Sequence, residues 1–467
     1  MNNTSNTLLK TIVPTKKFFN KFEAVICQAA IFCFVYLAIK YAFPFFYPYY
    51  ANSEFTIKTE TSRTIISIIG LVFLWFSLLK ERKLFEENKR ISFIAIIVVN
   101  LWYFLPGMFM NILYICQLEY VVIYTVFCVI LNILIMFGSK NKVTTPKIRR
   151  VSFKIQENKI LNNDDVCIVI AAVILIASLF LNGFSINITN LFDNSDIYQT
   201  RFENRIFNSG YLYYVWYFVV CGSCIIPTWT IISLEKKQFL RAAFYTLCIC
   251  SFYSVSCNRQ FLFLHAFVFA FYFLRKKDNA VLYVTLVMWL LTYLEIFYLK
   301  EATVGDIVRR LSVVPNVNAN FHVDYFLKFE PDALRQAWNF YLSRIGISSP
   351  YSESIAATIG NTYYGYVINA NTGLVGGTFA NYGYFSLIIG PVLYTVALKI
   401  LDKFFIGIEN KSVYFVTAVV LAFNFTNSET FLEQIIVPSW ILLYYLSLWI
   451  LPTIKSFKKP LLERVKE

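Results

Sequence analysis

The sequence is poor in charged residues and in histidine. Of its 467 residues, only 15% are Asp, Glu, Lys or Arg, and only two are histidines. Hydrophobic residues make up 58% of the chain, which is more apolar surface than a water-soluble domain hides. Long uncharged segments recur from one end to the other, as in polytopic helical membrane proteins. Because these segments are continuous rather than alternating, a transmembrane β-barrel is excluded.

The pattern predicts an all-α polytopic membrane protein with about twelve transmembrane helices. The expected spans are residues 24–42, 64–79, 91–115, 120–138, 166–183, 211–233, 242–256, 260–274, 280–298, 382–400, 413–430 and 434–451. Most of the 42 Lys and Arg residues fall in the segments that a cytoplasmic N-terminus would leave inside. Since basic loops remain in the cytoplasm, both termini are predicted to be cytoplasmic.

The net charge of +14 arises mainly from these inner segments. Runs such as "KERKLFEENKR" therefore serve topology and contact with membrane lipids, and no base-reading motif predicts nucleic acid as a partner. The ten cysteines lie almost wholly inside the expected spans, and no metal-ligand spacing is present. We expect neither a metal nor another cofactor.

One integral membrane domain, 1–467, accounts for the whole sequence, with a large external loop at 299–381. Loops of this size commonly carry function. Within the loop, "TVGDIVRRLSVV" predicts a short amphipathic helix with Ile307 and Leu311 on one face and the two arginines elsewhere. The segment "PDALRQAWNFYLSRIG" predicts a second helix that begins at Pro331 and Asp332.

Arginines on the outer face are the first candidate site residues. The basic inner segments already fix the orientation of the protein in the membrane, so the outer arginines are not needed for it. The arginine side chain makes paired hydrogen bonds to phosphate. As a set they favour a phosphate-bearing ligand, while pairing with nearby carboxylates or lipid head groups remains the alternative for each one. The candidates are Arg201, Arg205, Arg259, Arg309, Arg310 and Arg344.

Three residues of the external loop are candidates for a catalytic base. His322 and Asp324 lie close together in "NVNANFHVDYF", and Glu353 lies in "SPYSESIAATIG". Each could accept a proton near neutral pH. A structural role for His322 beside its aromatic neighbours remains open, and Glu295, near the outer end of a span, is a comparable candidate.

The stretch "NTYYGYVINANTGLVGGTFANYGYFSLIIGP", residues 361–391, is rich in glycine, asparagine and tyrosine and has no charged residue. Glycine permits close backbone approach, so we expect a tightly folded re-entrant or capping segment. Amide side chains and tyrosines suit the hydroxyls and flat faces of sugars. The candidate sugar-binding residues are Asn361, Tyr364, Asn369, Asn371 and Asn381.

Four motifs resemble segments of the Wzy-like oligosaccharide repeat-unit polymerases, which make O-antigen and capsular polysaccharide. "NANTGLVGGTFANYGYFSLIIGP" resembles the family segment that enters a late span, and "RRLSVVPNVNANFHVDYF" resembles the one that opens the large loop. "SCNRQFLF" and "DIYQTRF" are similar to two earlier arginine segments. The likeness covers about residues 190–400 in order and spacing, although His322 stands where the family pattern has an aromatic residue.

The resemblance implies a glycosyltransferase of the bacterial cytoplasmic membrane. In such an enzyme a glycan on undecaprenyl diphosphate is transferred to another lipid-linked repeat unit at the outer face, without a nucleotide sugar or a metal. The implied partners are undecaprenyl-diphosphate-linked oligosaccharides, membrane lipids and a chain-length regulator.

Two rival functions remain open from the sequence. An O-antigen ligase performs the same transfer in lipopolysaccharide synthesis, with a different acceptor. A lipid-linked oligosaccharide flippase is a transporter, for which short loops and charges in a central cavity would be expected.

Overall fold

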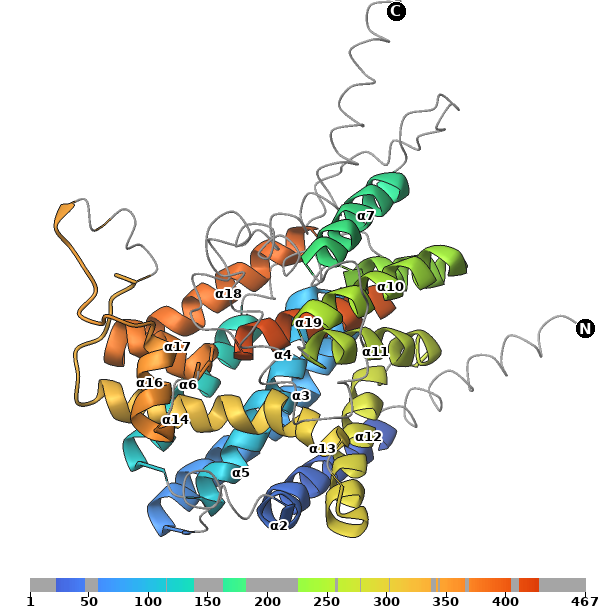
Figure 1. The fold of residues 1–467 in the computed structure, drawn as a ribbon. Helices are drawn as coiled ribbons and strands as arrows, with labels where there is room; N and C mark the ends of the chain where they lie inside the picture. Colours follow the sequence, from blue (N-terminus) through green and yellow to red (C-terminus); the bar gives the residue numbers. More distant parts are fainter. Residues whose placement is uncertain are drawn as a thin grey trace, which may run out of the picture.

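The computed structural model describes residues 22–46, 58–114, 116–137, 163–181, 226–256, 259–277, 279–301, 303–336, 342, 345–365, 369–404 and 411–427. The described part is almost wholly helical and contains no β-strand, which confirms the all-α prediction (Figure 1). The α-helices are α2 (Phe43–Phe46), α3 (Thr61–Asn88), α4 (Ile91–Val99), α5 (Leu105–Leu113), α6 (Leu118–Phe137), α7 (Asn163–Leu181), α10 (Phe239–Ser256), α11 (Arg259–Phe273), α12 (Ala280–Leu294), α13 (Thr303–Val308), α14 (Val314–Phe326), α16 (Ile355–Tyr364), α17 (Leu374–Tyr382), α18 (Ser386–Phe404) and α19 (Lys411–Asn427). Four π-helical segments, η1 (Ala38–Ala42), η3 (Asn100–Phe104), η6 (Glu295–Leu299) and η7 (Arg309–Val313), and one 3-10 turn, η9 (Gly383–Phe385), join them.

Within the described residues, six helical stretches are long and apolar enough to cross a membrane. They are Phe22–Phe45, Thr61–Asn88, Ile91–Leu113, Leu118–Phe137, Ala280–Leu299 and Leu374–Asp402. Four further expected spans correspond to shorter apolar helices, at Cys167–Leu181, Phe239–Ser254, Leu262–Phe273 and Lys411–Ala422. The expected span 434–451 and both termini lie outside the described residues, as does most of 211–233.

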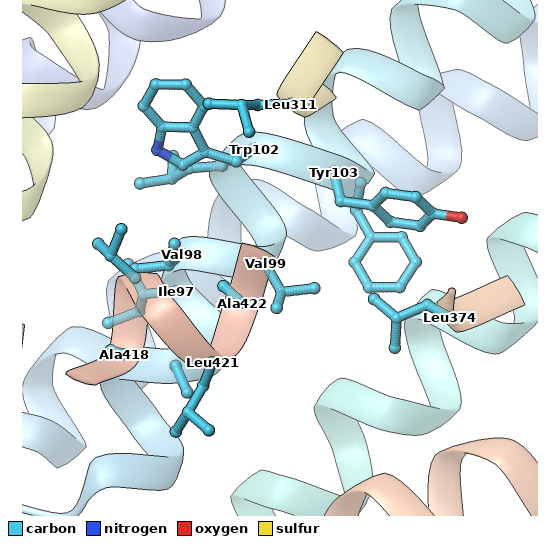
Figure 2. Close-up of a cluster of buried hydrophobic side chains, with 14 of the residues drawn as sticks. Ile97, Val98, Val99, Trp102, Tyr103, Leu311, Leu374, Ala418, Leu421 and Ala422 are labelled. Carbon is cyan, nitrogen blue, oxygen red and sulfur yellow. The ribbon is translucent and has the colours of Figure 1, made fainter. Parts of the chain in front are cut away.

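The stretch Ile91–Leu113 occupies the centre of the bundle. Its sequence begins ISFIAIIVV, which is apolar on every side, so no face of the helix favours solvent or a single neighbour. Accordingly its whole hydrophobic window is buried inside the protein. Helices α3, α18 and α19 pack around α4, and Figure 2 shows side chains of α4, η3, η7, α17 and α19 meeting in this core.

Helix α3 illustrates how the outer helices expose apolar side chains and bury small and polar ones. Its exposed apolar residues recur at helical spacing, namely Ile65, Ile68, Ile69, Val72 and Phe76. Its small and polar residues face inward, including Ser67, Gly70 and Ser77. This arrangement is the reverse of that in a water-soluble bundle, and it is the one expected where the surroundings are hydrocarbon.

A polar cluster lies inside the bundle where α3, η3 and α6 meet. Glu81 is fully buried, and its Oε2 accepts a hydrogen bond of 3.0 Å from Nδ2 of Asn100. Asn100 and Asn132 exchange amide hydrogen bonds of 2.7 and 3.2 Å. The other carboxyl oxygen of Glu81 has no hydrogen-bond partner, and no ion pair of Glu81 occurs among the described residues. Because an unpaired buried polar group is costly, the hydrogen bond from Asn100 is the contact that stabilises the Glu81 carboxyl group in this place.

The glycine-rich stretch is more regular than the sequence predicts. A re-entrant or capping segment is expected, but only residues around Gly365 and 369–373 are irregular in the described part. From Leu374 the chain is helical through α17, η9 and α18 as far as Phe404. The expected span 382–400 therefore starts earlier, because glycine, alanine and threonine in α17 are small enough for a buried helix.

Candidate functional site

The candidate site is built on a rod formed by α13, η7 and α14, residues Thr303–Phe326. Its start is fixed by Glu295, whose carboxylate accepts hydrogen bonds from the backbone nitrogens of Thr303 (2.6 Å) and Gly305 (2.8 Å). A carboxylate at a helix N-terminus satisfies unbonded donors and complements the helix dipole. Glu295, one of the candidate bases, thus has a structural task as the cap of α13.

Arg309 and Arg310 lie in the π-helical segment η7, and both form ion pairs with Asp306. The distances are 3.9 Å from Arg309 Nη1 and 3.2 Å from Arg310 Nε. Arg309 is 7% exposed, whereas the side chain of Arg310 is 40% exposed. A shared carboxylate holds the two like charges together, and a π-helical turn is often found at functional sites. A phosphate arriving from outside would meet Arg310 first.

The rod is locked into the bundle by Asn316, in the first turn of α14. Its amide donates to the carbonyls of Tyr103 (3.0 Å) and Ser312 (2.6 Å), and its oxygen accepts from the hydroxyl of Tyr124 (2.7 Å). All these groups are buried. Since satisfied buried networks are rigid, η7 and its arginines are held at a fixed position against η3 and α6.

His322 lies in the interior of the rod rather than on a surface. It is fully buried, and its Nδ1 is 2.8 Å from the carbonyl oxygen of Asn318, so Nδ1 carries the proton. Burial lowers the pKa of His322 to about 4, which leaves the ring neutral at pH 7. Its Nε2 has no hydrogen-bond partner. A base must touch the hydroxyl that it deprotonates, and the geometry here gives His322 no such access.

Asp324 is a crowded acceptor at the far end of the rod. Lys328 Nζ lies 2.9 and 3.0 Å from its two oxygens, and both the Tyr363 hydroxyl and the Gln117 amide donate to it. These contacts join α14 to α16 and to the start of α6. Asp324 is therefore a connecting residue with its oxygens occupied, which disfavours it as a base.

Glu353 differs from the other two candidate bases because it is exposed. Its Oε2 accepts a hydrogen bond of 3.0 Å from Nδ2 of Asn361, and its carbonyl accepts one of 2.5 Å from Gln336. It precedes Ser354, which caps α16 through the backbone nitrogen of Ala357 (3.2 Å). Of the three, Glu353 alone combines an accessible carboxylate with a side chain that orients it.

Two candidate sugar-binding residues line up beside the rod. The Tyr364 hydroxyl donates to Oδ1 of Asn318 (2.8 Å), and the Asn318 amide donates to the carbonyl of Asn371 (2.8 Å). Oδ1 of Asn371 is buried without a hydrogen-bond partner, while Asn369 is exposed. Figure 1 shows α14, α16 and α17 gathered on one side of the molecule.

Asn381 does not fit the role predicted for it. It is 3% exposed, its amide donates to the carbonyl of Gly377 (2.8 Å), and its oxygen accepts from the backbone nitrogen of Leu334 (3.0 Å). With both ends of the amide occupied, Asn381 fastens the segment around Leu334 to α17. We therefore correct its assignment from sugar binding to loop anchoring.

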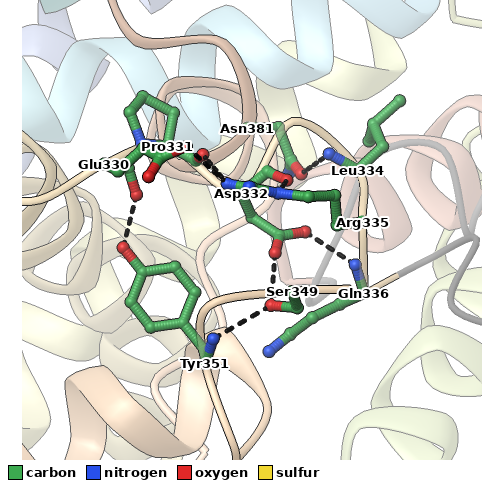
Figure 3. A network of polar contacts seen from close by, with 9 residues as sticks. All are labelled: Glu330, Pro331, Asp332, Leu334, Arg335, Gln336, Ser349, Tyr351 and Asn381. Atoms are coloured by element: carbon green, nitrogen blue, oxygen red, sulfur yellow. Dashed lines mark hydrogen bonds and ion pairs between the residues drawn. The ribbon is translucent and has the colours of Figure 1, made fainter. Parts of the chain in front are cut away.

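The sequence alone does not mark Asp332, the residue at the centre of this anchor, as a site residue. It is fully buried, and its oxygens accept from the Gln336 backbone nitrogen (2.8 Å) and the Ser349 hydroxyl (2.6 Å), as Figure 3 shows. Its own backbone nitrogen donates to the carbonyl of Ala380 (2.9 Å).

The same residues correct the predicted start of a helix at Pro331, while 337–341, 343 and 344 of that predicted helix lie outside the described residues. Ala333 and Leu334 have φ of 53° and 63°, in the left-handed region that a right-handed helix does not contain. Side-chain hydrogen bonds of aspartate offer the backbone an alternative to helix, and a Pro-Asp pair is the signal that could have indicated this turn.

The remaining arginines contribute less to the described geometry. Arg259 is the first residue of α11. Arg201, Arg205 and Arg344 lie outside the described residues. No group of metal-ligating side chains occurs in the part of the chain that the structure describes.

Together the fold and the site define an all-helical protein with several helices able to cross a membrane and a helical assembly bearing arginine, carboxylate and amide groups. Comparisons with family models, curated proteins and solved structures found no match.

Proposed function

We propose that the protein is a glycosyltransferase that polymerises undecaprenyl-diphosphate-linked oligosaccharide repeat units into O-antigen or capsular polysaccharide. The reaction would take place at the outer face of the bacterial cytoplasmic membrane. The observation that supports it best is the pair Arg309 and Arg310, held by Asp306 at one end of a rigid rod. Eight residues further along the rod, Asn318 bonds Tyr364, about 12 Å away at the helical rise of 1.5 Å per residue.

The chemistry needs charge stabilisation at one end of this arrangement and sugar recognition at the other. The acceptor hydroxyl attacks the anomeric carbon of the donor sugar, a new C–O bond forms, and the bond to the diphosphate oxygen breaks. The diphosphate departs with the bonding electrons, and Arg310 and Arg309 stabilise its negative charge. Arg259, the third predicted diphosphate-binding arginine, would contribute to the same stabilisation. Glu353 takes the proton of the acceptor hydroxyl, and Asn361 holds the Glu353 carboxylate in place.

The decisive experiment replaces arginine by lysine, which changes the geometry of the hydrogen-bond donors but keeps the positive charge. Lysine keeps the positive charge of arginine but loses its forked pair of hydrogen bonds. Removing one donor to a developing anion costs about 3 to 4 kcal/mol, or roughly 100- to 1000-fold in rate. Arg310→Lys should therefore be produced in normal amounts yet yield mainly short glycan chains, measured by gel electrophoresis of the surface polysaccharide, and Arg259→Lys should behave in the same way.

Lys300→Gln is the matched control, because Lys300 is an exposed outer cation that lies over the ring of Phe45, 3.7 Å away. An exposed charge is worth at most about 1 kcal/mol, so this variant should make chains of normal length. Wild-type chain lengths in both lysine variants would overturn the proposed diphosphate site.

Gene deletion separates the rival functions. Under the proposal, single repeat units accumulate at the outer face and the long polymer disappears. Accumulation of lipid-linked units on the inner leaflet would indicate a flippase, and unattached long polymer would indicate a ligase.

A further inference from the structure

The side-chain amide of Gln336 holds the backbone on both sides of Ser354. Its Nε2 donates a hydrogen bond of 2.5 Å to the carbonyl of Glu353, and its Oε1 accepts one of 3.0 Å from the backbone nitrogen of Ile355. A carboxamide carries a donor and an acceptor side by side, so one side chain satisfies both backbone groups at once. The backbone that carries Glu353 is therefore fixed at two points by a residue 17 positions away in the chain.

Gln336 is itself tied to the bundle through Asp332. The backbone nitrogen of Gln336 donates to Oδ2 of Asp332 (2.8 Å), which is fully buried, and Figure 3 shows this contact. The backbone nitrogen of Asp332 donates in turn to the carbonyl of Ala380 (2.9 Å), near the end of α17. Helix α17 packs on α14 of the rod. A short path of hydrogen bonds thus leads from the rigid part of the site to the segment of Glu353.

The backbone and the carboxylate of Glu353 are oriented by different residues. Gln336 holds the Glu353 carbonyl, and Asn361 of α16 donates to the Glu353 Oε2 at 3.0 Å. The side chain of Glu353 is nevertheless exposed, so the surrounding packing does not fix it. A general base must lie within hydrogen-bond reach of the hydroxyl that it deprotonates, and a displacement of about 1 Å can lower a rate about a hundredfold. An exposed base on a loop therefore depends on contacts of this kind.

We propose that Gln336 is a positioning residue, which sets the place of the Glu353 carboxylate relative to the acceptor hydroxyl. This role rests on the proposed function, in which Glu353 takes the proton of that hydroxyl. Gln336 acts on the backbone of Glu353 and takes no part in the proton transfer. Its contribution to the rate therefore passes wholly through Glu353, and it should vanish when Glu353 can no longer accept a proton.

The test is a double-mutant cycle on the full-length protein in proteoliposomes. Gln336→Met removes both amide hydrogen bonds but keeps the length of the side chain and the backbone bond to Asp332. The substrate is the lipid-linked repeat units extracted from cells that lack the gene, and chain growth is measured against their concentration. We expect kcat to fall about ten- to hundredfold with KM nearly unchanged. In a Glu353→Gln background, the same substitution should change kcat by less than about twofold.

Tyr351→Phe is the matched control. It removes one hydrogen bond of the same loop, from the Tyr351 hydroxyl to the carbonyl of Glu330, and leaves the bonds of Gln336 in place. This variant should keep the wild-type kcat. Hydrogen exchange checks the contact without the reaction, because the Ile355 amide loses its acceptor in Gln336→Met. That amide should exchange faster in Gln336→Met than in the wild type or in Tyr351→Phe.

The outcomes separate this inference from the proposed function. Equal losses of kcat from Gln336→Met in both backgrounds, or unchanged exchange at Ile355, would overturn the positioning role alone. So would a wild-type kcat in Gln336→Met beside a low kcat in Glu353→Gln. A wild-type kcat in Glu353→Gln, or no chain growth by the wild-type protein, would instead refute the proposed chemistry and the positioning role with it. Should Gln336→Met be poorly produced, Gln336→Asn, which is one methylene shorter, must show the same loss that depends on Glu353.

Discussion

His322 is the residue whose chemistry depends most on where the fold places it. Free in solution its side chain titrates near pH 6.5, but within α14 it is fully buried and its pKa falls to about 4. Between these two values the unfolded chain binds a proton at this group that the folded protein does not. Stability therefore decreases as the pH falls through this window and is fully retained above about pH 6.5.

We predict that His322→Asn makes the protein less sensitive to acid. The pKa difference corresponds to about 3 kcal/mol of stability lost by pH 4. Melting of the nanodisc-embedded protein, followed by tryptophan fluorescence at pH 7.5, 6 and 5, should show a smaller decrease for the variant than for the wild type. His265 is present in both proteins and cancels in the comparison. Parallel pH profiles would mean that His322 is protonated in the folded state or exposed to water.

The approach of α14 to α17 decides the shape of the candidate site at the scale of elements. A Cβ atom on Gly376 would lie 2.8 Å from the Cα of Ala319. A backbone atom, unlike the end of a flexible side chain, cannot move aside by rotation to relieve such a contact. The close contact lets Thr372 donate to the carbonyl of Pro315 (2.9 Å) and Asn318 reach the carbonyl of Asn371. Glycine in α17 is thus explained by helix packing.

We predict that Gly376→Ala destabilises the protein by about 1 to 3 kcal/mol, as overpacking of a tight contact does. The sign of this change in unfolding free energy is informative, because alanine has the higher helix propensity. Without the close contact to α14, the substitution would stabilise α17 by about 1 kcal/mol. Thermal melting in nanodiscs measures the change. Ala357→Gly serves as the reference for propensity alone, since Ala357 lies in the first turn of α16 and is only half-buried. A stabilised Gly376→Ala protein would contradict the described packing of α14 on α17.

At the scale of the whole molecule, the distribution of charge predicts its orientation in the membrane. The basic segments near residues 80–90 and 275–277 should be cytoplasmic, and the candidate site should face outward. Ser348 and Lys276 are both exposed, so each can be replaced without disturbing the core. We predict that a membrane-impermeant maleimide labels Ser348→Cys in intact cells, whereas Lys276→Cys reacts only after the membrane is opened.

The parent protein, with its native cysteines, provides the background for this labelling. If Lys276→Cys were labelled in intact cells and Ser348→Cys were protected, the topology would be the inverse of the predicted one. The candidate site would then face the cytoplasm, which contradicts a reaction at the outer face.

The sequence by itself determined the class of structure. In lipid, the backbone N–H and C=O groups of a long uncharged segment find hydrogen-bond partners only within a helix. Composition and periodicity alone therefore predict an all-helical membrane protein. The same local information located the helical segment of α13 and η7 that carries Arg309 and Arg310, because helical spacing and charge are properties of neighbouring residues. Local sequence information did not predict the helix α14 that follows it. It could not show that Glu295 caps α13, since that contact joins residues brought together by a turn.

Only the tertiary structure decided what each polar side chain does. His322, Asp324 and Glu353 are all candidate bases in the sequence. In the structure, His322 is buried, four donor contacts occupy the Asp324 carboxylate, and Glu353 remains accessible. Asn381 resembles Asn361 by type but is locked under the loop that Asp332 holds. Burial and hydrogen-bond partners are set by residues distant in the chain, and these determine whether a polar group binds a ligand or supports the fold.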